Sequence, residues 1–159
     1  PFQCRVLLYD PYLSIPQANA LGIKIASLQE VMACPIVSLH APCLPLTEGM
    51  ITGELLQLMP DGAVLLNSAD ARLVDGQALM QQLASGRISA ALDVYDKEPL
   101  PANHSLRNLK NVLLTPRIAG DSAAGRQEWA QAALEDALTA MEGLPVTSEV
   151  TRDTWPIID

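Results

Sequence analysis

The feature that most constrains this chain is an apolar run that leads directly into a cluster of charge. From Ile88 to Val94 the residues are almost all apolar, whereas charged residues begin at Asp93 and continue to Glu98, just before Pro99. A short, nearly continuous apolar run is typical of a strand covered on both faces in a parallel sheet. Because ligands bind outside the carboxyl ends of strands in open α/β sheets, this stretch predicts a site. An acidic, solvated turn after a strand explains the same residues equally well.

Short apolar runs alternate with helical patterns along the rest of the chain. Ser27 and Glu30 form a capping-box pattern, which predicts the start of a helix. Leu79 and Leu83 share one face of a second predicted helix, which stops at Gly86. This alternation predicts an α/β fold, a partial doubly wound (Rossmann-like) parallel sheet with flanking helices. The expected strands are residues 6–9, 22–26, 36–39, 63–66, 88–94 and 112–114, and the expected helices are residues 27–33, 52–58, 75–85 and 122–141.

The composition excludes several classes of partner. A length of 159 residues suits one ordinary domain, and a hydrophobic content of 49% can build a core. The net charge of −8 disfavours nucleic acid and anionic membranes as partners, since both need a basic surface. No apolar run approaches the roughly 20 residues of a membrane-spanning helix, and the first residues do not resemble a signal peptide. The three cysteines show no C-x-x-C spacing, so no disulfide framework or metal site is expected, and a cytoplasmic location fits best.

Four separated segments resemble one family. The stretch LDVYDKEP at residues 92–99 is similar to a family signature of LDV, an aromatic residue, mostly acidic positions and Glu-Pro. HAP at residues 40–42, LVD within residues 67–75 and TPRIAG at residues 115–120 agree in order and spacing. Together they resemble the NAD-dependent D-isomer-specific 2-hydroxyacid dehydrogenases. The resemblance implies a partial NAD-binding domain over residues 1–121, followed by a C-terminal helix and tail over residues 122–159.

Two of the catalytic positions that the resemblance implies are substituted. In the family, hydride passes between nicotinamide and a 2-hydroxy or 2-keto acid, while a histidine shuttles the proton, a glutamate holds that histidine and an arginine grips the substrate. Glu98 keeps the glutamate position, whereas Arg117 stands at the histidine position and Asp70 at the arginine position. An arginine stays protonated, so it cannot replace histidine as an acid or base near neutral pH. Arg72, two positions after the lost arginine, could reach back to serve as the clamp, and this alternative stays open.

The resemblance also implies which residues line the cofactor cleft. Asp93 matches an aspartate near the nicotinamide end, and His40 occupies a position that lines the cleft without moving a proton. The family often carries a threonine where this chain has Leu44. The implied cofactor-binding positions are Asp10, Pro11, His40, Ala41, Pro42, Thr47, Asn67, Ser68, Ala69, Asp93, Ala119 and Gly120.

Asp10 and Pro11 end the first apolar run. In dinucleotide-binding folds an acid at the end of the second strand accepts hydrogen bonds from the adenosine ribose, so Asp10 would favour NAD over NADP. An ordinary Asp-Pro turn is the alternative, and on local sequence it is the more common one. The glycine-rich turn G-x-G-x-x-G of such folds occurs nowhere in the 159 residues. We therefore expect the sequence to begin at the second strand, as a fragment of a longer protein that lacks a strand from the middle of the sheet.

Two classes of function remain open. The first is the NAD-binding portion of a D-2-hydroxyacid dehydrogenase-like oxidoreductase with weak or absent turnover, whose partner is a small 2-hydroxy or 2-keto acid. The second is a non-catalytic cofactor-binding or assembly protein on the same fold. In either case we expect a homodimer in the full-length protein. The stripe of Trp129, Ala133, Leu134 and Leu138 predicts that the last helix packs against another element.

Overall fold

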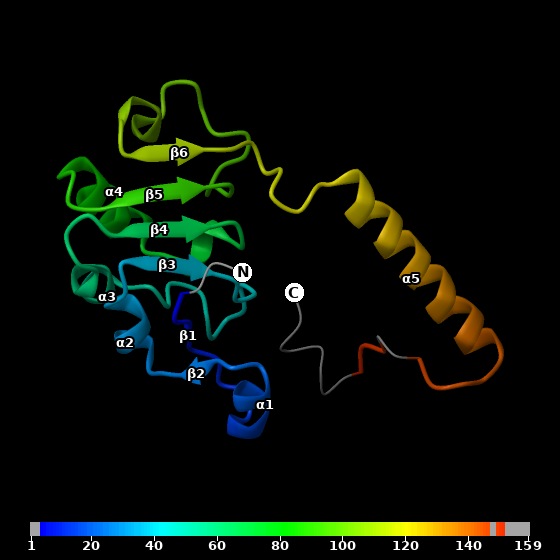
Figure 1. Cartoon of the computed structure of the whole chain (residues 1–159). Helices are drawn as coiled ribbons and strands as arrows, with labels where there is room; N and C mark the ends of the chain where they lie inside the picture. The colour runs from blue at the N-terminus through cyan, green and yellow to red at the C-terminus, as the bar shows by residue number, and fades with distance from the viewer. Residues whose placement is uncertain (1–3, 147–148, 152–159) are drawn as a thin grey trace.

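The computed structural model describes residues 4–146 and 149–151, which form two parallel sheets with short helices and one long helix that stands apart (Figure 1). Part of the expected C-terminal tail therefore lies outside the described residues. The strands are β1 (Leu7–Leu8), β2 (Lys24–Ile25), β3 (Ile36–Leu39), β4 (Val64–Asn67), β5 (Ser89–Leu92) and β6 (Val112–Leu114). The helices are α1 (Ile15–Ala20), α2 (Leu28–Met32), α3 (Gly53–Leu58), α4 (Gly76–Ala84) and α5 (Ala123–Met141), with 3-10 turns η1 (Ala71–Leu73) and η2 (Ser105–Asn108).

Every strand pair is parallel. The larger sheet has the order β3-β4-β5-β6, and the smaller sheet pairs β1 with β2. Figure 1 draws β1 between β3 and β2, but among the described residues no backbone pairing joins the two sheets. The α/β class and the parallel sheet are thereby confirmed, and the sheet is interrupted between β1 and β3.

Helix caps explain where the helices begin. The side chain of Ser27 accepts a hydrogen bond from the N–H of Glu30, whose carboxylate accepts one from the N–H of Ser27, so the predicted capping box is present. Thr52 caps α3 and Asp75 caps α4 with a side-chain oxygen alone, which accepts from the N–H of Leu55 and of Ala78 respectively. Gly86, with φ of +74°, ends the turn after α4, a conformation that suits glycine.

Helix α1 has no counterpart among the predicted elements. It begins with a capping box between Ser14 and Gln17, and Pro16 occupies the first turn. These are ordinary start signals for a helix. The pattern was available in the sequence, but the helix is only 6 residues long and buries only Ala18, so no apolar periodicity marks it.

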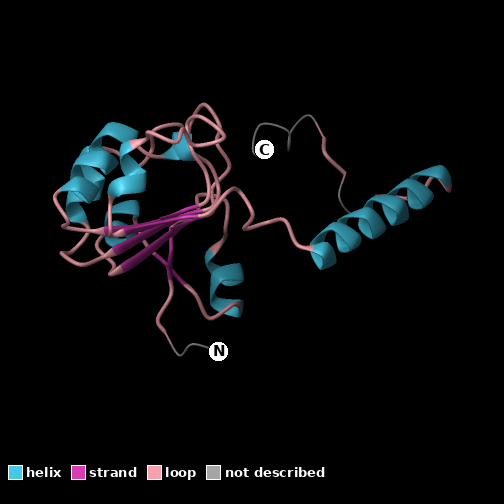
Figure 2. Ribbon diagram, turned by 90° about the horizontal axis from the view of Figure 1, so that it is seen from above, coloured by secondary structure: helices cyan, strands magenta, loops and turns pink. Residues whose placement is uncertain are grey.

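The core lies on one face of the larger sheet. Val37, Leu65 and Ala90, from neighbouring strands, belong to one buried cluster with side chains of α2, α3 and α4. Figure 2 shows helices gathered on one face of the sheet. The helices contribute side chains that are at most 1% exposed, namely Met32, Leu56 and Leu83.

The opposite face is covered incompletely. The run at residues 88–94 predicts a strand buried on both faces, but Ser89 and Ala91 are only half-buried in β5. On the same face Ile36 is 65% exposed. The prediction that β5 is buried on both faces is therefore wrong, since within the described residues no element fully covers the second face.

Helix α5 contradicts the packing predicted from its apolar stripe. Trp129 is 66% exposed, Leu134 60% and Leu138 51%, and no residue of the helix is buried. Figures 1 and 2 both show α5 extending away from the sheets. Within the described residues nothing covers these side chains.

Candidate active site

The predicted site residues gather where the strands end. The arrowheads of β3 to β6 point to one edge of the larger sheet, and the loops that leave this edge carry most of the predicted positions (Figure 1). By strand, these positions are Asp10 and Pro11 after β1; His40, Ala41, Pro42 and Thr47 after β3; Asn67, Ser68, Ala69 and Asp70 at the end of β4; Asp93 and Glu98 after β5; and Arg117, Ala119 and Gly120 after β6.

Asp93 is bonded to the segment that follows β6. Its side chain accepts hydrogen bonds from Thr115 Oγ1, from the N–H of Ile118 at 2.9 Å and from the N–H of Ala119 at 2.9 Å. Burial by itself raises the pKa of Asp93, but these hydrogen bonds together outweigh burial and lower the pKa below its ordinary value. Asp93 is 6% exposed, so an ionised carboxylate holds the loop after β6 from inside the protein.

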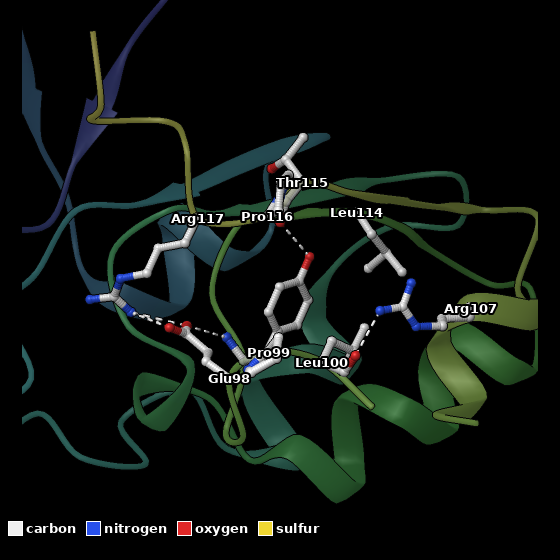
Figure 3. A pocket seen from close by; sticks show the side chains of 9 residues that line it. Glu98, Pro99, Leu100, Arg107, Leu114, Thr115, Pro116 and Arg117 are labelled. Carbon is white, nitrogen blue, oxygen red and sulfur yellow. Dashed lines mark hydrogen bonds and ion pairs between the residues drawn. The ribbon is translucent and has the colours of Figure 1, made fainter. Parts of the chain in front are cut away.

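This loop places Arg117 in an unusual conformation. Arg117 has φ of +55°, the left-handed region that non-glycine residues seldom occupy. Its guanidinium donates from Nη1 to both carboxylate oxygens of Glu98, at 3.0 and 3.1 Å (Figure 3). Glu98 is thus bonded to the cation that stands where the resemblance places a histidine.

Asp70 is paired with Arg72 and not with Arg117. Nε and Nη2 of Arg72 donate to the two oxygens of Asp70, at 3.0 and 2.7 Å. This pairing lowers the pKa of Asp70, with the charge of Arg117 acting in the same direction, and it raises the pKa of Arg72. The Arg72 side chain remains 57% exposed. The guanidinium that could have served as a substrate clamp is therefore occupied by the carboxylate two residues before it.

Two hollows flank the Arg117–Glu98 pair. One, of about 300 Å³, is polar and brings Asp70, Arg72, Asp96, Glu98 and Arg117 together. The other, of about 400 Å³, lies beyond the pair and has more apolar walls (Figure 3). Its lining residues are Tyr95, Glu98, Pro99, Leu100, Arg107, Leu114, Thr115, Pro116 and Arg117.

Tyr95 and Arg107 were not singled out in the sequence. The Tyr95 hydroxyl lies 2.9 Å from the carbonyl oxygen of Leu92 and 2.7 Å from that of Thr115, so it joins the ends of β5 and β6. Burial raises the pKa of Tyr95, with the charge of Asp93 adding to the effect. Arg107 donates to the carbonyl oxygens of Pro101 and Leu100. The aromatic residue of LDVYDKEP was a usable signal for Tyr95, whereas nothing local marks Arg107.

The loops after β3 and β4 are held by their own polar residues. Thr47 Oγ1 donates to the carbonyl oxygen of Pro42 at 2.6 Å and accepts from the N–H of Leu44 at 2.7 Å, which closes the loop after β3. Buried Asn67 donates to the carbonyl oxygen of Asp70 at 2.8 Å. These contacts shape the edge of the sheet and involve no titratable group.

His40 and Asp10 have local partners. A nitrogen of His40, Nε2, lies 2.8 Å from Ser38 Oγ. One oxygen of Asp10 accepts from the N–H groups of Tyr12 and Leu13, at 2.8 and 3.2 Å, so the ordinary Asp-Pro turn, the alternative interpretation of this segment, is present. Asp10 lies just after the carboxyl end of β1.

Within the described part of the chain, no group of three or more histidine, cysteine, aspartate or glutamate residues could hold a metal ion. The same residues contain no helix with the length and apolar character needed to span a bilayer.

The fold and the charged strand ends define a nucleotide-binding type of α/β domain. Residues 1–119 match the family described as D-isomer specific 2-hydroxyacid dehydrogenase, NAD binding domain. The chain belongs to this family. The predicted resemblance is therefore confirmed, and NAD is the cofactor class of this domain.

Curated relatives are a third or more identical to the chain over the stretch that aligns. A D-3-phosphoglycerate dehydrogenase of Archaeoglobus fulgidus is 33% identical over 150 residues, which are 93% of this chain and 28% of the relative. A glyoxylate reductase of Thermofilum pendens is 40% identical over 109 residues, 68% of this chain and 32% of the relative. The chain thus spans about a third of the length of these relatives.

Solved structures superpose on most of the chain. The D-mandelate dehydrogenase of Rhodotorula graminis gives a TM-score of 0.82 at 26% identity, covering 93% of this chain and 44% of that one. A D-isomer specific 2-hydroxyacid dehydrogenase of Xanthobacter autotrophicus, solved with NADPH and MES, gives 0.76 at 31% identity, covering 92% and 60%. Both support the Rossmann-like fold.

Proposed function

We propose that this chain is the NAD-binding portion of a D-2-hydroxyacid dehydrogenase-like protein whose catalytic arginine and histidine positions have been replaced. Such a protein binds NAD and turns over 2-hydroxy or 2-keto acids weakly or not at all. The observation that carries the proposal is the Arg117–Glu98 ion pair, because it fills the position of a proton shuttle with a group that does not titrate near neutral pH.

The chain's residues fit NAD at both ends of the cofactor. Asp10 would accept hydrogen bonds from the adenosine ribose, and the loops of His40 and Asn67 would line the cleft between the ends. Asp93 holds Ala119 and its neighbours at the nicotinamide end. The dinucleotide supplies or accepts the hydride when it is bound. No G-x-G-x-x-G turn for the pyrophosphate is present in the sequence.

The replaced positions remove two contributions to catalysis. Positioned acid–base help typically contributes about 10² to 10⁴ in rate, and an electrostatic clamp about 10² to 10³. Arg117 supplies neither an acid nor a base, and Asp70 would repel an anionic substrate. Arg72 keeps the needed charge, but its bidentate pairing with Asp70 opposes the role of clamp.

The same ion pair favours a second candidate, a non-catalytic cofactor-binding or assembly protein on this fold. The two candidates differ in residual turnover. A cytoplasmic location and homodimerisation of the full-length protein stay predictions, and the free thiols of Cys4 and Cys34 suit a reducing compartment.

Cofactor binding is tested by titration calorimetry with NAD. We expect the isolated chain to bind weakly, with a dissociation constant above the micromolar range, because no glycine turn grips the pyrophosphate. Tighter binding by the isolated chain, or a preference for NADP, would contradict the roles assigned to the missing turn and to Asp10.

Catalysis is tested in a longer form of the protein that includes a glycine turn. We expect no measurable reduction of pyruvate, glyoxylate or hydroxypyruvate with NADH. Asp70→Arg and Arg117→His together should recover some activity, whereas either change alone should recover little, since clamp and shuttle act as a unit. Ordinary turnover by the unchanged protein would refute the proposal. If the double variant binds NAD but stays inert, the non-catalytic candidate gains.

A further inference from the structure

The apolar hollow beyond the Arg117–Glu98 pair is also lined by a second cation, Arg107. The hollow measures about 400 Å³, which lies within the range of small-molecule sites. Figure 3 shows Arg107 on one side of it and the Arg117–Glu98 pair on the other. Small-molecule sites combine apolar walls with a few polar groups that fix the ligand. The bonding state of the polar groups therefore determines what this hollow can bind.

Most polar groups around the hollow are already bonded within the protein. The hydroxyls of Thr115 and Tyr95 both make hydrogen bonds to other protein groups. Glu98 accepts from Arg117 with both carboxylate oxygens, so this pair carries no net charge. Arg107 is therefore the group that gives the hollow its net positive charge.

Arg107 is held in place but is not neutralised. Its Nε donates to the carbonyl oxygen of Pro101 at 2.9 Å, and its Nη2 donates to that of Leu100 at 2.7 Å. A guanidinium has five N–H donors, so three remain after these two bonds, on Nη1 and Nη2. Among the residues that the structure describes, no carboxylate pairs with Arg107. Its charge and the edge formed by Nη1 and Nη2 are therefore available to a ligand.

This free edge of the guanidinium suits a carboxylate. Two parallel N–H groups of a guanidinium bind the two oxygens of a carboxylate, and such charge-assisted hydrogen bonds are about twice as strong as neutral ones. The two carbonyl contacts of Arg107 already restrict its side chain. Less conformational entropy is therefore lost when an anion binds.

Apolar side chains define the rest of the ligand. Leu100 is buried, and Tyr95 and Leu114 are half-buried, so part of each wall still faces solvent. The hydroxyl of Tyr95 is bonded at the ends of β5 and β6, which fixes the ring as a flat wall of the hollow. An apolar body placed against these side chains would remove apolar surface from water, which is favourable.

We propose that this hollow binds a small organic acid, with its carboxylate on Arg107 and an aromatic or branched apolar body against Tyr95, Leu100 and Leu114. The site goes beyond the proposed dehydrogenase chemistry, because it uses neither the cofactor-binding positions nor the charge of Arg117. Binding at this site requires neither NAD nor turnover.

The test uses the whole chain without cofactor. Phenylacetate is titrated against isotope-labelled protein, and the backbone amide resonances are followed by NMR. Phenylacetamide has nearly the same shape without the charge, and acetate has the charge without the apolar body. Arg107→Gln removes the guanidinium. Lys110→Gln, a change at an exposed residue that does not line the hollow, is the control matched for loss of one positive charge.

We expect phenylacetate to shift the amide resonances of Leu100, Arg107 and Leu114. Phenylacetamide should bind at least tenfold more weakly, as should phenylacetate to the Arg107→Gln variant, because the charge-assisted hydrogen bonds are lost. Acetate should also bind at least tenfold more weakly, because it covers no apolar wall. Lys110→Gln should leave the dissociation constant within twofold of wild type.

Three results would overturn the proposal. The first is equal affinity of the unchanged chain for phenylacetate and phenylacetamide, a comparison that does not depend on the folding of any variant. The second is an Arg107→Gln variant that folds and binds phenylacetate as tightly as wild type. The third is the absence of shifts around the apolar hollow at millimolar phenylacetate, including the case in which shifts occur only around the neighbouring polar hollow.

Discussion

At the scale of single residues, Asp93 shapes the candidate site by fixing the segment that follows β6. It is 6% exposed, and it gathers donors from Thr115, Ile118 and Ala119 around one carboxylate. These bonds stabilise the left-handed conformation of Arg117, which by itself costs about 1 to 2 kcal/mol for a non-glycine residue. Asp93 thus supports the Arg117–Glu98 pair through the backbone next to Arg117, without bonding to the guanidinium or to the Glu98 carboxylate.

The dependence on Asp93 predicts a pH effect. Because the folded pKa of Asp93 is lowered below the roughly 3.9 of an unfolded aspartate, its contribution to stability is present above that value. The contribution is lost as pH falls through the folded pKa. We expect Asp93→Asn to lower the free energy of unfolding by about 1 to 3 kcal/mol at pH 7, with a smaller difference from wild type at pH 2 to 3, measured by urea unfolding.

Asp96→Asn is the matched control, since Asp96 lies three residues later and is exposed. It should leave stability within about 0.5 kcal/mol of wild type at every pH, as surface changes usually do. Equal effects of the two substitutions would show that Asp93 acts through net charge and not through its hydrogen bonds.

At the scale of elements, the sequence predicted those strands and helices that carry their own local signals. Strands β3 and β6 have the predicted bounds, because each is an apolar run closed by proline or a polar residue. Helices α2, α3 and α4 begin and end within one residue of the predicted bounds, α2 from its capping box and α3 and α4 from apolar spacing and their stop signals. Helix α1 was missed although Ser14 and Gln17 form a capping box, because a short exposed helix shows no periodicity.

Arg87 joins α3 to α4, and no local sequence pattern predicts this contact. Its guanidinium donates to the carbonyl oxygens of Leu56 and Met59 at the end of α3, and to Gln82 in α4. Lysine keeps the charge but lacks this fork of donors. We expect Arg87→Lys to lower the free energy of unfolding by about 1 to 3 kcal/mol, measured by urea unfolding at neutral pH. Arg126→Lys in α5, an exposed matched change, should cost less than about 0.5 kcal/mol.

At the scale of the whole molecule, the site could be predicted only as a set of positions. The motif order brought Asp70, Glu98 and Arg117 to one edge of the sheet, and the structure places all three around one hollow. Which carboxylate pairs with which arginine depends on loop geometry, and Arg72 reaches Asp70 because η1 folds it back. The roles of these residues stay predictions, as does the division of the chain at residue 121.

The exposure of α5 allows that division to be tested. None of the 19 residues of α5 is buried, so the helix contributes little packing. Most of the free energy of unfolding should therefore come from the residues before residue 122. We expect removal of residues 122–159 to change the free energy of unfolding of the remaining domain by less than about 1 kcal/mol, measured by urea unfolding followed through tyrosine fluorescence. Circular dichroism should lose helical signal in the same comparison. A larger loss of stability would mean that the apolar stripe of α5 packs on the sheets in solution, as its sequence alone predicts.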